Sequence, residues 1–350
     1  MSPKFEHTPR VDPAAEPACS RRAVLAGTGA FVAGAMVSPA RAEGADALWS
    51  GEYSAAKERN GKKISLAIYR KRLGPPQPGE PARPVLFLVH GSSISALSAF
   101  DLTVPGKGEY SLMNVFARYG FDVWTMDHEN YGRSARTEGN SDIASGVQDL
   151  AAASRVVARE TGQSRPHFMG ESSGALRAGA FAAAEPDRVG RLVLSAFTWT
   201  GKNSPTLQKR AEQVEFFRAH NMRPRGRDMI RSIFTRDKPG TSDPAVAEAM
   251  ADAELKFGDA VPTGTYLDMT ANLPVVDPTK VLAPVLLIRG EHDGIASLED
   301  LLAFYQALSN PDRQFVIMPG AAHSIAFGLN REQFWHVMHA FLAMPPRADT

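Results

Sequence analysis

Residues 170–174 read Gly170-Glu171-Ser172-Ser173-Gly174 and fit the pattern G-x-S-x-G. A short apolar run leads into them, and the residues after them favour a helix over 175–184. A serine at a sharp strand-to-helix turn has strained backbone angles, and glycines on both sides let the strand and helix approach closely. The turn lifts the hydroxyl clear of the sheet and sets the Ser173 N–H at a helix N-terminus. The motif therefore predicts Ser172 as a nucleophile; a plain Ser/Gly loop is the alternative interpretation.

A serine hydroxyl is a weak nucleophile unless a base takes its proton. His323 follows the last expected strand, over 314–318, and a loop there can reach the end of the strand that carries Ser172. We therefore predict that His323 is the general base. His336 and His339 stand three apart on an expected helix, but no third ligand lies near them in the sequence, so no metal site is predicted.

A carboxylate must orient the imidazole, and it should follow an earlier strand. The expected strand over 285–289 leads into Gly290-Glu291-His292-Asp293. Asp293 is the preferred candidate, and Glu291 is its rival. The chain order serine, aspartate, histidine is the one expected for a mostly parallel sheet of this kind.

A developing oxyanion needs two N–H donors. The buried-type strand over 85–89 ends in His90-Gly91-Ser92, where the glycine permits close backbone approach. We assign the Ser92 N–H as the partner of the Ser173 N–H, and we expect His90 to support this loop. Tyr131, in the loop after the next strand, either stabilises a turn or lines the site.

Strands and helices alternate along most of the chain, which predicts an α/β fold with a doubly wound, mostly parallel sheet. Asn60-Gly61 predicts a hairpin between two strands at the start. The alternation stops between residues 198 and 270, where prolines separate several short helical segments. We expect this segment to form a helical cap over one edge of the sheet, between core segments 43–197 and 271–350.

These motifs together resemble the α/β-hydrolase superfamily, in its capped branch with a serine nucleophile. The resemblance covers about residues 52–342 and is specific for the fold and the triad, but much less for the substrate. Serine at position 172 argues against the dehalogenase and epoxide hydrolase branches, whose nucleophile is aspartate. Two features depart from common patterns: Glu171 is acidic, and no Gly-Gly-Gly follows His90.

The resemblance implies a cofactor-free hydrolase of a carboxylic ester, a lactone or a related small acyl compound. Acyl transfer, C–C bond hydrolysis and cofactor-free perhydrolysis are alternatives that use the same residues, and a non-catalytic binding protein is a further one. Glu171, Tyr131 and Trp199 are candidates for substrate contact. Residues 202–238 carry ten Lys or Arg and four Asp or Glu side chains. This excess either attracts an anionic substrate or forms a solvated helical face.

The chain has 350 residues, of which 43% are apolar and 22% charged, and its formal net charge is +1. This balance does not suggest a nucleic-acid partner, and no apolar run is long enough for a permanent membrane span. The oligomeric state is not predicted. Cys19 is the single cysteine.

The N-terminus has the features of an export signal. Arg21 and Arg22 precede a mildly apolar, glycine-rich run, and Ala40-Arg41-Ala42 supplies a cleavage site. We therefore expect residues 1–42 to be a twin-arginine-type signal peptide. The mature protein is then expected in the periplasm or outside the cell.

Overall fold

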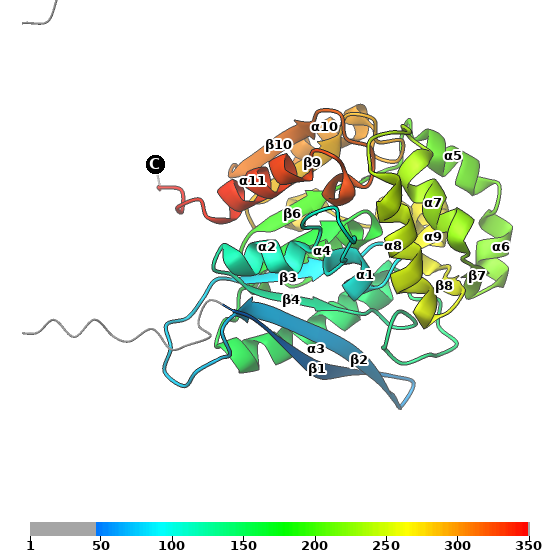
Figure 1. Cartoon of the computed structure of the whole chain (residues 1–350). Coiled ribbons are helices and arrows are strands. Elements are labelled where there is room, and N and C mark those ends of the chain that lie inside the picture. The colour runs from blue at the N-terminus through cyan, green and yellow to red at the C-terminus, as the bar shows by residue number, and fades with distance from the viewer. Residues whose placement is uncertain (1–46, 349–350) are drawn as a thin grey trace, which may run out of the picture. The chain divides into compact units, whose positions relative to one another are not determined.

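The structure is a computed structural model that describes residues 47–348. The predicted signal peptide, residues 1–42, lies outside the described residues. An eight-stranded sheet runs through the core in the order β1-β2-β4-β3-β5-β6-β9-β10 (Figure 1). Its strands are β1 Leu48–Arg59, β2 Lys62–Leu73, β3 Val85–Val89, β4 Asp122–Met126, β5 His167–Glu171, β6 Leu192–Ser195, β9 Val285–Gly290 and β10 Arg313–Met318.

The antiparallel and the parallel strands of the sheet differ in their sequence patterns. β1 and β2 form the predicted antiparallel hairpin, and β2 also pairs antiparallel with β4, whereas β3, β4, β5, β6, β9 and β10 run parallel. Every residue of β3, β4 and β6 is buried, as expected for parallel strands covered on both faces. The alternation of apolar and polar residues in β1 and β2 instead fits a hairpin at the edge of the sheet.

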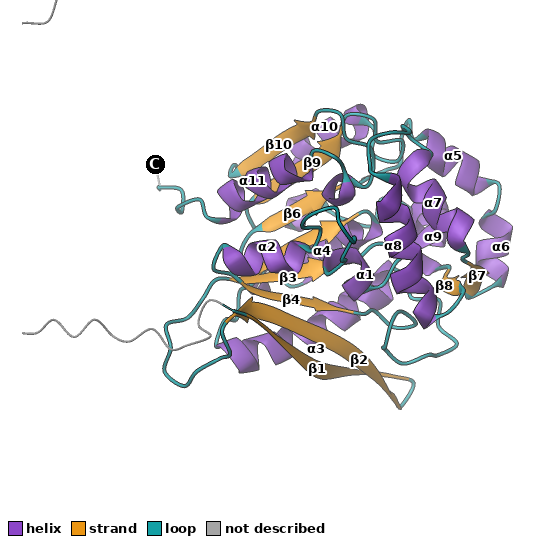
Figure 2. Ribbon diagram, in the orientation of Figure 1, coloured by secondary structure: helices purple, strands orange, loops and turns teal. Residues whose placement is uncertain are grey.

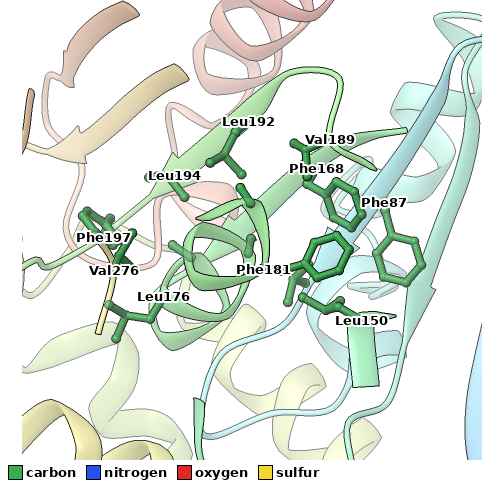
Figure 3. Close-up of a cluster of buried hydrophobic side chains, with 14 of the residues drawn as sticks. Phe87, Leu150, Phe168, Leu176, Phe181, Val189, Leu192, Leu194, Phe197 and Val276 are labelled. Carbon is green, nitrogen blue, oxygen red and sulfur yellow. The ribbon is translucent and has the colours of Figure 1, made fainter. Parts of the chain in front are cut away.

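Helices cover both faces of this sheet (Figure 2). One apolar cluster contains side chains of α3, α4 and α10, and Figure 3 shows part of it around Phe168, Phe181 and Leu194. A second cluster contains side chains of α1, α2 and α11. These helices are α1 Ala96–Phe100, α2 Leu112–Arg118, α3 Ile143–Thr161, α4 Ser173–Ala184, α10 Leu298–Ala307 and α11 Arg331–Leu342. The predicted doubly wound α/β fold is therefore confirmed.

The segment between β6 and β9 gathers beyond one end of the sheet, at the right of Figure 1. It holds α5 Pro205–Ala211, α6 Val214–Ala219, α7 Arg227–Thr235, α8 Pro244–Glu254 and α9 Gly264–Leu267. It also contains a two-stranded sheet of β7 Met222–Pro224 and β8 Ala260–Pro262, which the sequence did not predict. Three-residue strands that pair across 38 positions leave no alternating pattern to detect. We call this segment the cap.

Parallel strands end at a common edge, and here the loops after β3, β5, β9 and β10 leave the sheet together. They carry Ser92, Ser172, Asp293 and His323 respectively. Within residues 47–348, none of the helices has the length and apolarity that a membrane span needs.

Candidate active site

Ser172 occupies a strained turn between β5 and α4. Its φ is 58° and its ψ is −124°, a conformation that L-residues rarely adopt. The turn is tight because a side chain on Gly174 would overlap the carbonyl oxygen of Val89, and one on Gly170 would overlap the backbone of Gly174. Glycine at both positions is thus a packing requirement, and the strained turn lifts the Ser172 side chain from the sheet edge.

His323 and Asp293 extend a hydrogen-bond chain from this serine. The Ser172 hydroxyl lies 3.0 Å from His323 Nε2, and His323 Nδ1 lies 2.9 Å from Asp293 Oδ1. With the proton on Nδ1, the imidazole donates to the carboxylate, and its Nε2 is free to accept from the hydroxyl. Both partners are buried, since His323 and Asp293 are each 5% exposed. In this arrangement the imidazole can take the proton of the Ser172 hydroxyl while the Asp293 carboxylate orients it.

The carboxylate of Asp293 is held in its charged form. Burial by itself raises its pKa, but His323 and the N–H donors of Ile295 and Ala296 outweigh this effect and leave the pKa below its ordinary value. Those N–H groups lie 2.8 and 3.1 Å from Oδ1. The rival, Glu291, is exposed and instead accepts from the Gly320 N–H at 2.8 Å. The structure therefore brings Asp293, and not Glu291, to the imidazole.

The predicted oxyanion residues lie beside the nucleophile. Gly91 packs against Ser172, because a Cβ built on it would be 3.3 Å from Ser172 Cβ. The Ser92 hydroxyl donates to Ser173 Oγ at 2.7 Å, which ties the loop after β3 to the start of α4. Across residues 47–348, the backbone N–H groups of Ser92 and Ser173 find no protein acceptor. Both donors thus remain available to an oxyanion.

Buried polar groups of the core hold the loop that carries Ser92 in place. The Tyr131 hydroxyl donates to the Ser92 carbonyl at 2.9 Å, and its ring packs edge-on against His90. The His128 N–H donates in turn to His90 Nε2 at 3.2 Å. Tyr131 is 2% exposed and does not line the cavity at Ser172. The prediction that Tyr131 lines the site is therefore not met at this cavity, and its hydrogen bond supports the loop.

Hydrogen bonds also attach the cap to the same loop. Thr265 Oγ1 donates to the Ser92 hydroxyl at 2.8 Å, and the Tyr266 hydroxyl lies 2.7 Å from Ser93 Oγ. In α8, Glu254 accepts from both the N–H and the hydroxyl of Ser95. The same carboxylate forms a buried ion pair with Arg225. The cap thus helps to set the position of the oxyanion donors.

A cavity of about 40 Å³ lies over the serine. Its lining residues are Gly91, Ser92, Ser93, Ile94, Ala99, Glu171, Ser172, Arg210, Ile233, Arg236, His323, Ser324 and Phe327. Glu171, a predicted substrate contact, therefore lies at this cavity. Burial, and to a lesser degree the charge of Asp293, raise its pKa to about 7. A carboxyl group in this state is only partly ionised at neutral pH.

Trp199 does not reach this cavity. Its indole N–H donates to the Val276 carbonyl at 3.1 Å, and its ring packs against Phe304. The prediction that Trp199 contacts substrate is therefore wrong. An aromatic residue just after a strand can pack inward on the core, and its sequence position does not reveal which way it points.

Arg210 and Arg236 also line the cavity, although no local motif in the sequence marks them as cavity residues. The only signal was the basic excess of residues 202–238, which does not show which cations face the serine. Asp237 is a further neighbour, since ligand-type atoms of Asp237, Asp293 and His323 all lie within 4.8 Å of one another. A cation held there would compete with the bond between His323 and Asp293.

Comparisons with known proteins give one family match. The profile of the family described as "Serine aminopeptidase, S33" matches residues 104–330. No curated protein is significantly similar in sequence.

Many solved structures share the fold. An E-2-(acetamidomethylene)succinate hydrolase aligns with a TM-score of 0.61 at 18% identity, over 84% of this chain and all of the other. The enol-lactonase from Burkholderia xenovorans LB400 aligns with a TM-score of 0.56 at 17% identity, over 83% and 100%. A thermophilic esterase from Thermogutta terrifontis aligns with a TM-score of 0.57 at 19% identity, over 83% and 98%. At such identities the likeness concerns the fold alone.

Proposed function

Because the chain belongs to the α/β-hydrolase family described as serine aminopeptidase, S33, we propose that it hydrolyses a carboxylic ester, a lactone or a related small acyl compound through Ser172, His323 and Asp293. The observation that carries the proposal is the unbroken hydrogen-bond chain, with 3.0 Å between Ser172 and His323 and 2.9 Å between His323 and Asp293. The esterase and the lactonase with the same fold make these substrate classes a natural choice.

The proposed reaction proceeds in two halves. The Ser172 oxygen attacks the carbonyl carbon while His323 Nε2 takes the hydroxyl proton. The carbonyl oxygen becomes an oxyanion that accepts from the Ser92 and Ser173 N–H groups. His323 then gives its proton to the leaving oxygen as the C–O bond breaks, which leaves an acyl-enzyme. Water repeats the sequence, with His323 as its base, and releases the acid and free Ser172.

The strained turn and the fixed loops support this proposal. Donors and base held before substrate arrives need little reorganisation in the transition state, and this is where electrostatic catalysis is most effective. The Asp293 carboxylate holds the imidazole tautomer and stabilises the imidazolium that forms during attack. Each component therefore has a distinct role in one mechanism.

The direct test is turnover of an activated ester such as 4-nitrophenyl acetate. We expect Ser172→Ala to lower kcat by about 10⁴-fold or more. The exposed Ser309→Ala is the matched control and should keep wild-type activity. Full activity in Ser172→Ala, with the substitution verified by mass, would refute the nucleophile assignment.

The same residues can also transfer an acyl group to an alcohol, cleave a C–C bond or form a peracid. Product analysis with water alone, with added alcohol and with added peroxide separates these reactions. Aminoacyl arylamides belong in the same panel because of the family description. We expect hydrolysis of oxygen esters to dominate. Faster cleavage of the arylamides would replace the ester by an amide as the substrate class.

We also propose that residues 1–42 direct export by the twin-arginine route. The paired Arg21 and Arg22 before an apolar run and the Ala40-Arg41-Ala42 site support this proposal. The full chain expressed in a bacterium with this pathway should yield a mature periplasmic protein that begins at Glu43. Replacing both arginines by lysine should leave the precursor in the cytoplasm, and unchanged processing would contradict the proposal.

A further inference from the structure

Two arginines of the cap share the catalytic cavity. Arg210, at the end of α5, and Arg236, directly after α7, line the same space as Ser172 and His323. The Arg236 side chain is 22% exposed, and Arg210 is half-buried. Two positively charged side chains therefore line the cavity of the proposed nucleophile, where water has restricted access.

Neither guanidinium has the partners that such a position requires. Over the part of the chain that the structure describes, neither donates a hydrogen bond to a protein acceptor, and the Nε of Arg236 is buried without one. Asp237 is the nearest carboxylate to Arg236, with 3.5 Å from Oδ1 to Nε. Arg210 has only the ring of Tyr266, with 5.3 Å between the guanidinium carbon and the ring centre. Charged groups removed from water without hydrogen bonds are costly, so these donors favour a bound anion.

The local electrostatics point the same way. Burial, followed by the charge of Arg236, lowers the pKa of Arg210 to about 10, so this guanidinium still carries its charge at neutral pH. Glu171 faces the same cavity, but its pKa of about 7 leaves it only partly charged there. Among the residues that line the cavity, the two guanidinium groups therefore outweigh the partial charge of Glu171 near pH 7.

Most other arginines of the cap have carboxylate partners. Four are paired in this way: Arg218 with Glu215, Arg225 with Glu254, Arg227 with Glu248 and Asp252, and Arg231 with Glu248 and Asp228. Arg223 instead lies over the rings of Phe217 and Tyr266. Of the two cavity arginines, Arg236 has Asp237 beside it at 3.5 Å, and Arg210 has no carboxylate partner within residues 47–348.

The approach to the cavity is basic as well. A cleft of about 700 Å³ shares Ser93, Arg210, Ile233 and Arg236 with the cavity over Ser172. Lys209 and Arg223 also line it, and Asp237 is the one carboxylate among its lining residues. A cleft with this charge raises the local concentration of anions and their rate of entry.

The geometry points to a carboxylate-binding subsite formed by Arg210 and Arg236, so that the substrate is an acyl compound with a second, free carboxylate. The planar guanidinium fork matches a carboxylate with two parallel hydrogen bonds. Two forks beside the nucleophile would hold that group while the carbonyl lies at Ser172. This inference rests on the proposed function and narrows its substrate class.

The test compares substrates that differ in one charge. Mono-4-nitrophenyl succinate, glutarate and adipate each carry a free carboxylate, and methylation of that carboxylate gives a neutral partner of nearly equal size. Rates are corrected for spontaneous hydrolysis. We expect wild type to prefer at least one free acid over its methyl ester by about tenfold or more in kcat/KM.

The variants Arg210→Gln and Arg236→Gln should each lower kcat/KM for that acid by about 10- to 100-fold. They should change the rate with the methyl ester by less than about threefold, because the neutral ester makes no ionic contact. Arg227→Gln, on α7 and paired with Glu248 and Asp252, is the matched control and should behave as wild type. The Tm of Arg210→Gln should be unchanged or higher, since this side chain has no carboxylate partner in the described residues; Arg236→Gln also removes the cation beside Asp237, so its fold is verified by circular dichroism.

A binding measurement separates this inference from the proposed mechanism. Calorimetry should detect binding of the preferred dicarboxylate to the Ser172→Ala variant, and Arg236→Gln in that background should abolish it. Serine-dependent hydrolysis of the methyl esters without preference for the acids would overturn the subsite alone. A preference that survives both arginine variants would do the same. Dicarboxylate binding without turnover of any ester would contradict the proposed function and leave the subsite standing.

Discussion

His323 Nε2 lies 3.0 Å from the hydroxyl oxygen of Ser172, although 151 positions of chain separate the two residues. The parallel sheet makes this contact possible, because the loops after β5 and β10 leave the same edge. The strained turn at Ser172 and the buried carboxylate of Asp293 then fix the two ends of the contact.

Asp293→Asn should lower kcat by about 10⁴-fold with little change in Tm. An amide at this position no longer holds the required tautomer of His323 or stabilises its charged form. Glu291→Gln is the matched control, two positions away, and should cost less than about tenfold. Steady-state kinetics with 4-nitrophenyl acetate measures both. A larger loss in Glu291→Gln than in Asp293→Asn would reverse the assignment of the acid.

Thr265→Val should lower kcat about 3- to 10-fold and leave KM nearly unchanged. The substitution removes the hydrogen bond to the Ser92 hydroxyl and loosens the loop that carries an oxyanion donor. Thr270→Val removes a hydroxyl that bonds to the backbone carbonyl of Tyr266 and should leave kcat as in wild type. Equal kinetics for the two variants would show that the cap does not position the oxyanion loop.

Glu254→Gln should lower the free energy of unfolding by about 2–5 kcal/mol, because it leaves the buried charge of Arg225 uncompensated. Glu248→Gln breaks more exposed ion pairs with Arg227 and Arg231 and should cost much less, because solvent screens these charges. Urea denaturation gives both values. Similar losses of unfolding free energy in the two variants would argue against a special contribution of Glu254 to the stability of the cap.

Glu171→Gln should change how stability depends on pH. The folded-state pKa of Glu171, about 7, lies above its ordinary value of 4.5. Between these values the unfolded chain loses a proton that the folded protein keeps, so wild type is destabilised as pH rises through this window. Glutamine does not titrate, so the variant Glu171→Gln does not lose this stability as pH rises.

We therefore expect Glu171→Gln to gain stability over wild type between pH 4.5 and 8. The gain is at most about 3 kcal/mol, since the side chain keeps some contact with solvent. Urea denaturation at both pH values measures it. The exposed Glu58→Gln, treated in the same way, should show no such gain. A constant difference between wild type and Glu171→Gln would mean that Glu171 titrates alike in the folded and unfolded chains.

Much of the core was predictable because its signals are local. The unbroken apolar run of β3 and the Asn60-Gly61 turn each follow from a few adjacent residues. The meeting of Ser172, Asp293 and His323 could also be foreseen, because parallel strands bring their following loops to one edge.

The cap was harder to predict because its contacts join distant positions. β7 and β8 pair across the cap without any alternating pattern. The inward turn of Trp199 depends on Phe304, more than 100 residues later. The cavity position of Arg210 and Arg236 depends on how α5 and α7, which precede or carry them, pack in the cap. Such side-chain positions follow from three-dimensional packing, which cannot be read from the number of charges in a segment.

The most direct test of Ser172 as the nucleophile is to identify the residue at which a fluorophosphonate reacts with the native protein. The serine activated by His323 should attack phosphorus and expel fluoride, which gives a single adduct in the intact mass. Peptide mapping should place this adduct on Ser172, and His323→Ala should slow its formation by at least about a hundredfold. A folded protein that stays unlabelled, or that is labelled on another residue at the same rate with and without His323, would contradict the account.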